Sequence, residues 1–87
     1  MAYQVEFTAA AHRQFRKLTP EVQRRLAPAI DSLAEDPRPA SAKKLSGVEL
    51  WRIRVGDYRV IYALDDGKLT VLVVRLGHRR EVYDARP

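Results

Sequence analysis

Two turn signals fix how the second half of this sequence pairs into strands. In the stretch "WRIRVGDYRVIYALDDGKLTVLVV", Gly56-Asp57 suits a two-residue hairpin loop, and Asp66-Gly67 is the strongest kind of short hairpin signal. Side chains alternate between the two faces of a strand, so a two-residue loop at each turn decides which residues share a face. The sequence therefore predicts an antiparallel meander with strands at 48–55, 58–65 and 68–76, followed by a short final segment at 81–84.

The first hairpin places three arginines together. With a two-residue loop, Val55 pairs with Tyr58 and Arg54 pairs with Arg59. One face of the hairpin then carries the apolar side chains of a core: Trp51, Ile53, Val55, Tyr58, Val60 and Tyr62. The opposite face, which we call the arginine face, carries Arg52, Arg54 and Arg59.

The second hairpin puts apolar residues beside these arginines. If Asp66-Gly67 is the loop, the expected pairs are Leu64 with Leu69, Tyr62 with Val71, Val60 with Val73 and Arg59 with Val74. The arginine face then also carries Ile61, Ala63, Leu72 and Val74. An apolar floor of this kind reduces the screening of nearby positive charges by water.

Like charges on neighbouring strands need an explanation, because Arg54 directly opposite Arg59 destabilises a sheet. One explanation is structural: the side chains extend into solvent, or carboxylates such as Glu49 and Glu81 neutralise them. The other is functional: a phosphate binds among the guanidinium groups, which hold phosphate through two parallel hydrogen bonds. The sequence favours the second explanation and predicts an anion site on this face.

A strand and two helices precede the meander. Alternation in "AYQVEF" predicts a short strand, and Thr8 is a suitable N-cap for a first helix. "LTPE" predicts a second helix with Thr19 as N-cap and Pro20 at the first helical position. Pro28 falls inside this helix, away from its apolar stripe, which predicts a bend convex to solvent. The expected fold class is α+β, with the N-terminal strand and the helix pair packed on a small, mainly antiparallel twisted sheet, as one domain over 1–87.

Composition narrows the classes of function. Sixteen Lys and Arg against eleven Asp and Glu give a net charge of +5, which favours anionic partners such as nucleic acid. The chain has no cysteine and two isolated histidines, so we expect neither a metal site nor a cofactor. We also expect a cytoplasmic protein without a membrane partner, because "MAYQVEF" lacks the features of a secretory signal and no apolar run approaches about 20 residues.

Four segments carry a resemblance to a known family: "KKLSG", "LWRIRVGDYRVIYAL", "DDGKLTVLVVR" and "LGHRREVY". Together with the strand–helix–helix–meander order, they resemble the RelE/ParE superfamily of bacterial toxins, and most of all its RelE branch. The resemblance spans nearly the whole chain and implies a RelE-like microbial RNase fold. It implies the toxin of a type II toxin–antitoxin system, an endoribonuclease (mRNA interferase) that cuts messenger RNA in the ribosomal A site without a metal and so inhibits translation.

The resemblance also implies which residues carry the chemistry. Two strand lysines of the RelE branch correspond to Arg52 and Arg54, and the strand arginine corresponds to Arg59. The arginine after the glycine turn corresponds to Arg79, and the C-terminal tyrosine corresponds to Tyr83. Arginine in place of both lysines keeps the charge but excludes a role that needs a readily deprotonated amine.

Each of these residues has an expected role in the attack of a 2′-hydroxyl on its neighbouring phosphate. Arg59 and Arg79 clamp the phosphate, while Arg52 and Arg54 stabilise the charge of the transition state. Tyr83 acts as the general base once the cations lower its pKa from about 10.

Two of these roles have alternatives. The short segment between Gly77 and Tyr83 leaves Arg80 as an alternative to Arg79 for holding the phosphate. His78 is an alternative general base, or else a turn residue or an antitoxin contact. The residues expected to bind RNA without a catalytic role are Lys43, Lys44, His78 and Arg80.

The resemblance implies three partners: a cognate RelB-like antitoxin that is small and often acidic, the ribosome with messenger RNA in its A site, and operator DNA through the antitoxin complex only. Two other functions stay open. One is a ParE-like DNA gyrase poison, which binds a protein target and cuts nothing itself. The other is a non-catalytic RNA-binding or interaction module in which the arginines only bind.

Overall fold

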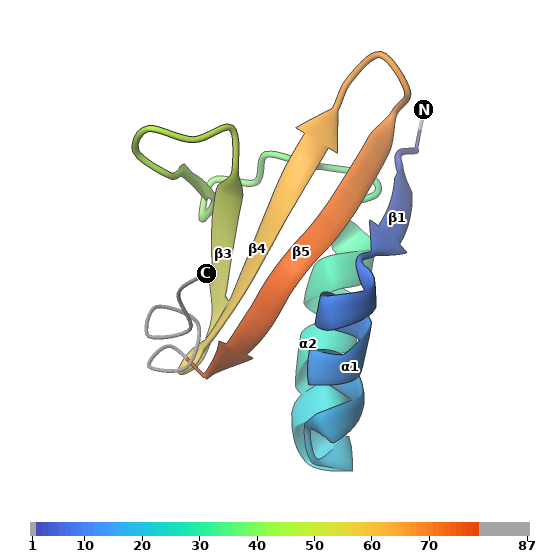
Figure 1. The fold of residues 1–87 in the computed structure, drawn as a ribbon, viewed down its shortest axis with the longest axis vertical. Coiled ribbons are helices and arrows are strands. Elements are labelled where there is room, and N and C mark those ends of the chain that lie inside the picture. The colour runs from blue at the N-terminus through green and yellow to red at the C-terminus, as the bar shows by residue number, and fades with distance from the viewer. Residues whose placement is uncertain (1, 79–87) are drawn as a thin grey trace.

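The computed structural model describes residues 2–78, and the predicted segment at 81–84 lies outside them. The elements are β1 (Gln4–Phe7), α1 (Ala9–Lys17), α2 (Pro20–Ser32), β2 (Lys43–Lys44), β3 (Trp51–Val55), β4 (Tyr58–Asp65) and β5 (Thr70–His78). The strands form one sheet in the order β1-β5-β4-β3-β2, in which β1 runs parallel to β5 and the other pairs are antiparallel. Helices α1 and α2 lie side by side on one side of the sheet (Figure 1). This arrangement confirms the predicted α+β fold class.

Both predicted helix starts are confirmed. The Thr8 hydroxyl accepts a hydrogen bond from the backbone N–H of Ala11 at 3.1 Å, and the backbone N–H of Thr8 donates to the carbonyl of Val73 at 2.9 Å. Thr8 therefore ends β1, begins α1 and fastens both to β5. At the start of α2, the Thr19 hydroxyl accepts from the backbone N–H of Val22 at 3.4 Å. Each cap satisfies a backbone donor that has no partner inside its helix.

The turn between the two helices is held by one side chain. The Gln23 amide nitrogen donates to the carbonyls of Phe15 at 2.9 Å and Leu18 at 3.2 Å, at the C-terminal end of α1.

Pro28 lies inside α2 and is exposed, so its ring faces away from the core as expected. The bend expected at this proline stays a prediction.

The core fills the space between the helices and the sheet. Its buried members are Ala11, Leu26, Ile30, Leu33, Ile53, Val60, Tyr62, Val71, Val73 and Leu76. Tyr62 is fully buried, and its hydroxyl donates to the carbonyl of Pro37 at 2.7 Å. Burial raises the pKa of Tyr62 to about 12. This tyrosine thus ties the connector after α2 to the centre of the sheet.

The connector between α2 and β3 contains an element that the sequence did not predict. Lys43 and Lys44 form the two-residue strand β2, which pairs with Arg52 and Trp51 at the edge of the sheet. A two-residue strand is too short to produce an alternating pattern, so the "KK" of "KKLSG" carried no strand signal.

The first hairpin has the predicted register at every pair from Val55 with Tyr58 to Trp51 with Tyr62. Gly56 has a φ of 61°, the backbone conformation expected for glycine at the first position of a two-residue loop. A Cβ atom at Gly56 would also lie 2.8 Å from a guanidinium nitrogen of Arg25 on α2.

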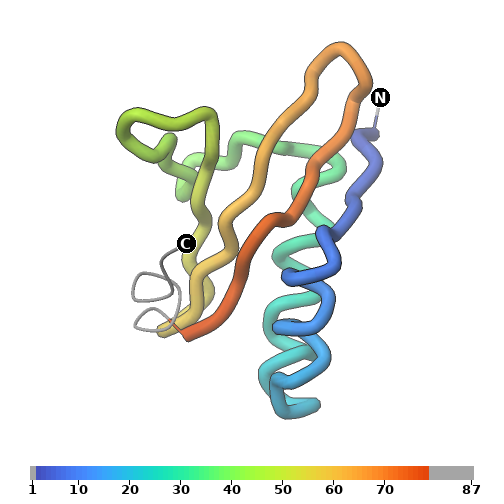
Figure 2. The backbone as a smooth tube through the Cα atoms, in the orientation of Figure 1, coloured from blue at the N-terminus to red at the C-terminus, as the bar shows by residue number. Residues whose placement is uncertain are grey.

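The predicted register of the second hairpin is wrong. The loop spans four residues, 66–69, so Leu64 pairs with Val71 rather than with Leu69. The Asp65 carboxylate accepts a hydrogen bond from the backbone N–H of Lys68 at 3.0 Å, which closes this wider loop. The Asp66 carboxylate is held elsewhere, by the Tyr3 hydroxyl at 2.6 Å and by the Arg38 guanidinium at 2.8 and 3.2 Å. Figure 2 shows this loop at the opposite end of β4 from the tight β3–β4 turn.

A second irregularity shifts the register again. Tyr62 pairs with Val73, but Ile61 pairs with Arg75, so Val74 is an extra residue, a β-bulge, in β5. Arg59 consequently pairs with Gly77 and not, as predicted, with Val74. Two contacts from the α1 region hold the bulge: the Thr8 hydroxyl donates to the carbonyl of Val74 at 3.2 Å, and the Gln14 side-chain oxygen accepts from the backbone N–H of Leu76 at 2.9 Å.

Candidate functional site

The arginine face is the side of the sheet that α1 and α2 leave uncovered, and its cations stand in two rows across the strands. The first row is Arg54 on β3, Arg59 on β4 and Gly77 on β5. The second row is Lys43 on β2, Arg52 on β3, Ile61 on β4 and Arg75 on β5. The three arginines predicted to lie together do lie on neighbouring strands, and a fourth joins them.

Arg59 is the central residue of this cluster. Its exposed fraction is 7%, and it is the one charged side chain that is buried among residues 2–78. Arg54 is directly opposite on β3, and Arg52 is diagonal to it on the same strand. On β5 the position opposite Arg59 is Gly77, which has no side chain and a φ of 155°. Gly77 is itself buried, and it contributes no side chain beside Arg59.

Arg75 is the functional candidate that the sequence reasoning missed. Strict alternation from Val71 and Val73 would have placed Arg75 under the helices, where a charged side chain is costly. The bulge at Val74 turns Arg75 to the arginine face, opposite Ile61. An arginine at a position that the strand pattern assigns to the core is the sequence signal that indicates such a bulge.

Two carboxylates on the strands of the arginine face, Asp65 and Glu6, lie far from this cluster. Asp65 is six residues along β4 from Arg59, about 20 Å away. Glu6 lies on the same face beside Leu72, which in turn pairs with Ala63, toward the Asp65 end. Glu49 is one of the carboxylates that could have neutralised the arginines, but its side chain forms an ion pair with Lys44 at 3.2 Å. Glu81 lies outside the described residues.

The structure separates the remaining predicted residues. Lys43 lies on the arginine face opposite Arg52, whereas Lys44 pairs with Trp51, whose side chain packs on the helix side of the sheet. His78 is the cross-strand neighbour of Tyr58, and the two rings meet edge to face with their centroids 5.7 Å apart.

Three predicted residues, Arg79, Arg80 and Tyr83, lie outside the described part of the chain. Within residues 2–78, the side chains around Arg59 on the arginine face are cations and apolar groups. This part of the site is suited to binding an anion and stabilising additional negative charge on it.

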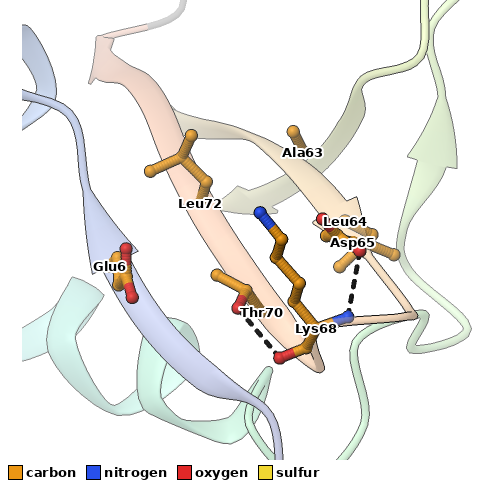
Figure 3. A pocket seen from close by; sticks show the side chains of 7 residues that line it. All are labelled: Glu6, Ala63, Leu64, Asp65, Lys68, Thr70 and Leu72. Carbon is orange, nitrogen blue, oxygen red and sulfur yellow. Dashed lines mark hydrogen bonds between the residues drawn. The ribbon is translucent and has the colours of Figure 1, made fainter.

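A shallow hollow of about 540 Å³ lies at the other end of the same face. Its lining consists of Glu6, Ala63, Leu64, Asp65, Lys68, Thr70 and Leu72. Figure 3 shows the Lys68 side chain extending over the hollow toward Leu72 and Ala63. The two ends of the face therefore differ in charge: four arginines at one end, and one lysine with two carboxylates at the other.

Two kinds of feature are absent from residues 2–78. They contain no group of three or more His, Cys, Asp or Glu side chains that could hold a metal ion. Neither of the two helices in this range is long and apolar enough to cross a membrane.

The chain resembles a known family of proteins over most of its length. A family model described as the ParE toxin of the type II toxin–antitoxin system parDE matches residues 5–83. The toxin RelG of Mycobacterium tuberculosis is 32% identical over an alignment of 87 positions, and the match covers 95% of this chain and 98% of that toxin. The mRNA interferase toxin RelE of Escherichia coli is 34% identical over an alignment of 88 positions, and the match covers 95% of this chain and 92% of that toxin.

Solved structures of toxin–antitoxin complexes also contain chains that are similar to this one. The toxin–antitoxin complex RelBE2 from Mycobacterium tuberculosis contains a chain that superposes with a TM-score of 0.81 at 30% identity, covering 91% of this chain and 93% of that one. The intact RelBE toxin–antitoxin complex of Escherichia coli contains a chain with a TM-score of 0.79 at 30% identity, covering 88% and 96%.

Proposed function

We propose that this chain, a RelE-like toxin that belongs to the ParE toxin family of type II toxin–antitoxin systems, is an endonuclease that cuts messenger RNA on the ribosome. The observation that carries the proposal is the guanidinium cluster around buried Arg59, whose composition follows from the strand register. A relative named mRNA interferase toxin, 34% identical over nearly its whole length, supports it.

The proposed reaction needs no metal ion and no cofactor. The ribose 2′-oxygen attacks the adjacent phosphorus while its proton passes to a general base. A bond from phosphorus to the 2′-oxygen forms and the bond to the 5′-oxygen breaks, which leaves a 2′,3′-cyclic phosphate. The departing 5′-oxygen takes a proton from Arg79 or a neighbouring group and becomes a free hydroxyl. The pentavalent intermediate carries extra negative charge, and preorganised cations lower its free energy.

The roles within the proposal follow the two rows of the arginine face. Arg59 holds the phosphate, and Arg52 and Arg54 stabilise the charge that develops on it. Arg79 clamps the phosphate from a second side, with Arg80 as the alternative. Tyr83 accepts the 2′-hydroxyl proton, which requires neighbouring cations to lower its pKa from about 10 toward neutrality.

The proposal includes partners. Both solved relatives described above are complexes of a toxin with its antitoxin. With a net charge of +5 and a cationic arginine face, this chain is expected to bind a small acidic antitoxin of the RelB kind. Operator DNA would be contacted through that complex. The ribosome, and hence the cytoplasm, would be the place of action.

The test is primer extension on messenger RNA bound to purified ribosomes with an empty A site. We expect a discrete cut within the A-site codon that requires the ribosome and that is lost in Arg59→Ala. Because Arg59 is buried, circular dichroism must show that the variant is folded; Arg54→Ala, at an exposed position, provides a second variant. Lys68→Ala, at the far end of the arginine face, is the matched control and should cut normally.

The match to a family model named for ParE toxins favours a second candidate, a DNA gyrase poison. If folded wild-type protein leaves ribosome-bound messenger RNA intact and instead blocks supercoiling by purified gyrase, the nuclease proposal is wrong. The arginine face would then be a binding surface for a protein.

A further inference from the structure

Arg75 lies on the arginine face because of the β-bulge at Val74, which hydrogen bonds to other parts of the fold stabilise. The extra residue Val74 in β5 reverses the direction that alternation would give to Arg75. The hydrogen bond from the Thr8 hydroxyl to the carbonyl of Val74, and that from the backbone N–H of Leu76 to Gln14, fix the backbone on both sides of Arg75. Both contacts come from the α1 region, more than 60 residues away in sequence.

The position reached by Arg75 is close to the centre of the cation cluster. Arg75 pairs with Ile61, whereas Arg59, two residues before Ile61, pairs with Gly77. Arg75 is therefore the diagonal neighbour of Arg59 on the next strand, a separation of about 7–8 Å that long side chains can bridge. Because the side chain at position 77 is absent, nothing from that residue stands between the two.

Arg75 also completes a pair across Ile61. Arg52 lies on one side of Ile61 and Arg75 lies on the other, each one strand away. Both side chains are half-buried, and both stand beside an apolar residue that reduces screening by water. An anion placed among these guanidinium groups is attracted by each of them and can accept paired hydrogen bonds from them.

We propose that Arg75 binds a backbone phosphate of the RNA substrate, as the β5 member of a phosphate-binding site whose other members are Arg52, Arg54 and Arg59. This inference rests on the proposed function, because it takes RNA as the anion. It adds a phosphate-binding residue, Arg75, that was not among the site residues predicted from the sequence. It also assigns a functional role to the β-bulge at Val74, because without the bulge the Arg75 side chain would lie on the helix side of the sheet.

The chain supplies a matched control for a test by charge removal. Lys68 is also a single cation over the arginine face, but it lies at the hollow at the other end (Figure 3). Arg75→Gln and Lys68→Gln each remove one positive charge and have the same effect on the net charge of +5. A difference between them therefore reports position on the face rather than overall charge.

The experiment measures binding of the full-length protein to a fluorescein-labelled single-stranded RNA oligonucleotide with 2′-methoxy groups, which cannot be cleaved. Fluorescence anisotropy gives the dissociation constant at several salt concentrations. Loss of one phosphate contact on a single strand should reduce the slope of log K against log salt by about 0.7. We expect this reduction, with roughly tenfold weaker binding, for Arg75→Gln and no change of slope for Lys68→Gln.

Arg75→Lys keeps the charge and provides a second variant if Arg75→Gln does not fold. It should retain the slope but bind more weakly than the wild-type protein, because an ammonium group cannot form the paired hydrogen bonds of a guanidinium. An Arg75→Gln slope equal to that of Lys68→Gln, or an Arg75→Lys affinity equal to that of the wild-type protein, would overturn the inference.

The same variants separate this inference from the proposed function. If the wild-type protein cuts ribosome-bound messenger RNA while Arg75→Gln retains the wild-type salt slope, the nuclease stands and the role of Arg75 is wrong. If the wild-type protein does not cut but Arg75→Gln lowers the slope, Arg75 binds RNA phosphate and the nuclease activity is wrong.

Discussion

The two hairpins of this sheet obtain their geometry from different sources. The β3–β4 turn is set by its own residues: Gly56 adopts a φ of 61°, and every predicted pair of that hairpin is present. The β4–β5 turn combines a local hydrogen bond, from the Lys68 N–H to the Asp65 carboxylate, with distant ones, because Asp66 is held by Tyr3 and Arg38. A local turn transmits its register directly, whereas a turn engaged by distant partners has its register decided by the tertiary structure.

This difference determines how the cation cluster is built. Arg54 and Arg59 meet because of the local turn, so their juxtaposition is encoded within six residues of sequence. Arg75 joins them because the α1 region holds a bulge in β5. The same face therefore combines a locally encoded half with a half that exists only in the assembled fold.

The largest effect that distinguishes the two hairpins is expected from Arg54→Ala. If the nuclease proposal holds, removing this guanidinium from the first hairpin should lower the rate of ribosome-dependent cleavage by about 100-fold, the usual loss for a preorganised charge-stabilising group. The same change removes a like charge directly opposite Arg59, so the free energy of unfolding should rise by a few tenths of a kcal/mol. Single-turnover cleavage and urea unfolding measure the two quantities.

A variant that is less active and slightly more stable would show that the like-charge pair is kept for function. Asp66→Ala, in the second hairpin, should give the opposite combination: the cleavage rate of the variant stays near that of the wild-type protein while its free energy of unfolding falls. Equal loss of cleavage in both variants would mean that the arginine face has no special part in the reaction.

The next effect compares the glycines of the two turns. Gly56→Ala puts a side chain at a φ of 61° and close to the Arg25 guanidinium, so we expect it to lower the free energy of unfolding by about 1–2 kcal/mol. At Gly67 an added Cβ would be at an ordinary 3.5 Å from the Asp65 carboxylate, and φ is not positive. Gly67→Ala should therefore change the stability by less than about 0.5 kcal/mol or increase it slightly. Thermal or urea unfolding of both variants decides the point, and equal losses would contradict the contrast between the turns.

The parts of the fold that the sequence predicted are those with local signals. The Thr8 and Thr19 caps, the first hairpin and the apolar face under the helices all follow from short-range chemistry. The register predicted for the second hairpin was wrong because the loop is four residues long and its Asp66 side chain is engaged by partners far away in sequence. It is shifted by two residues at Leu64, and by three at Val60, beyond the bulge.

The candidate site divides in the same way. Arg52, Arg54 and Arg59 were found because the first turn alone decides their face. Arg75 was missed because its place in the strand pattern is the one local sign of the bulge; the hydrogen bonds to Thr8 and Gln14 that hold the bulge join distant segments. Sequence reasoning therefore recovers the half of the site whose geometry is local, and it needs the assembled sheet for the other half.

The smallest effect concerns the charge that holds the second turn. The Arg38 guanidinium, together with the Tyr3 hydroxyl, lowers the pKa of the Asp66 carboxyl in the folded protein. Because the folded pKa is depressed, the stabilisation is present above the unfolded value of about 3.9 and is lost as pH falls through the folded value. The melting temperature of wild-type protein should therefore exceed that of Asp66→Asn at neutral pH, and the gap should close progressively below about pH 4.

Asp57→Asn, the matching change in the first turn, removes a carboxylate that forms no ion pair within residues 2–78, so it should produce no comparable gap. If the gap for Asp66→Asn stayed constant into acid, the second turn would be held by hydrogen bonding alone, and its register would not depend on the charge of Asp66.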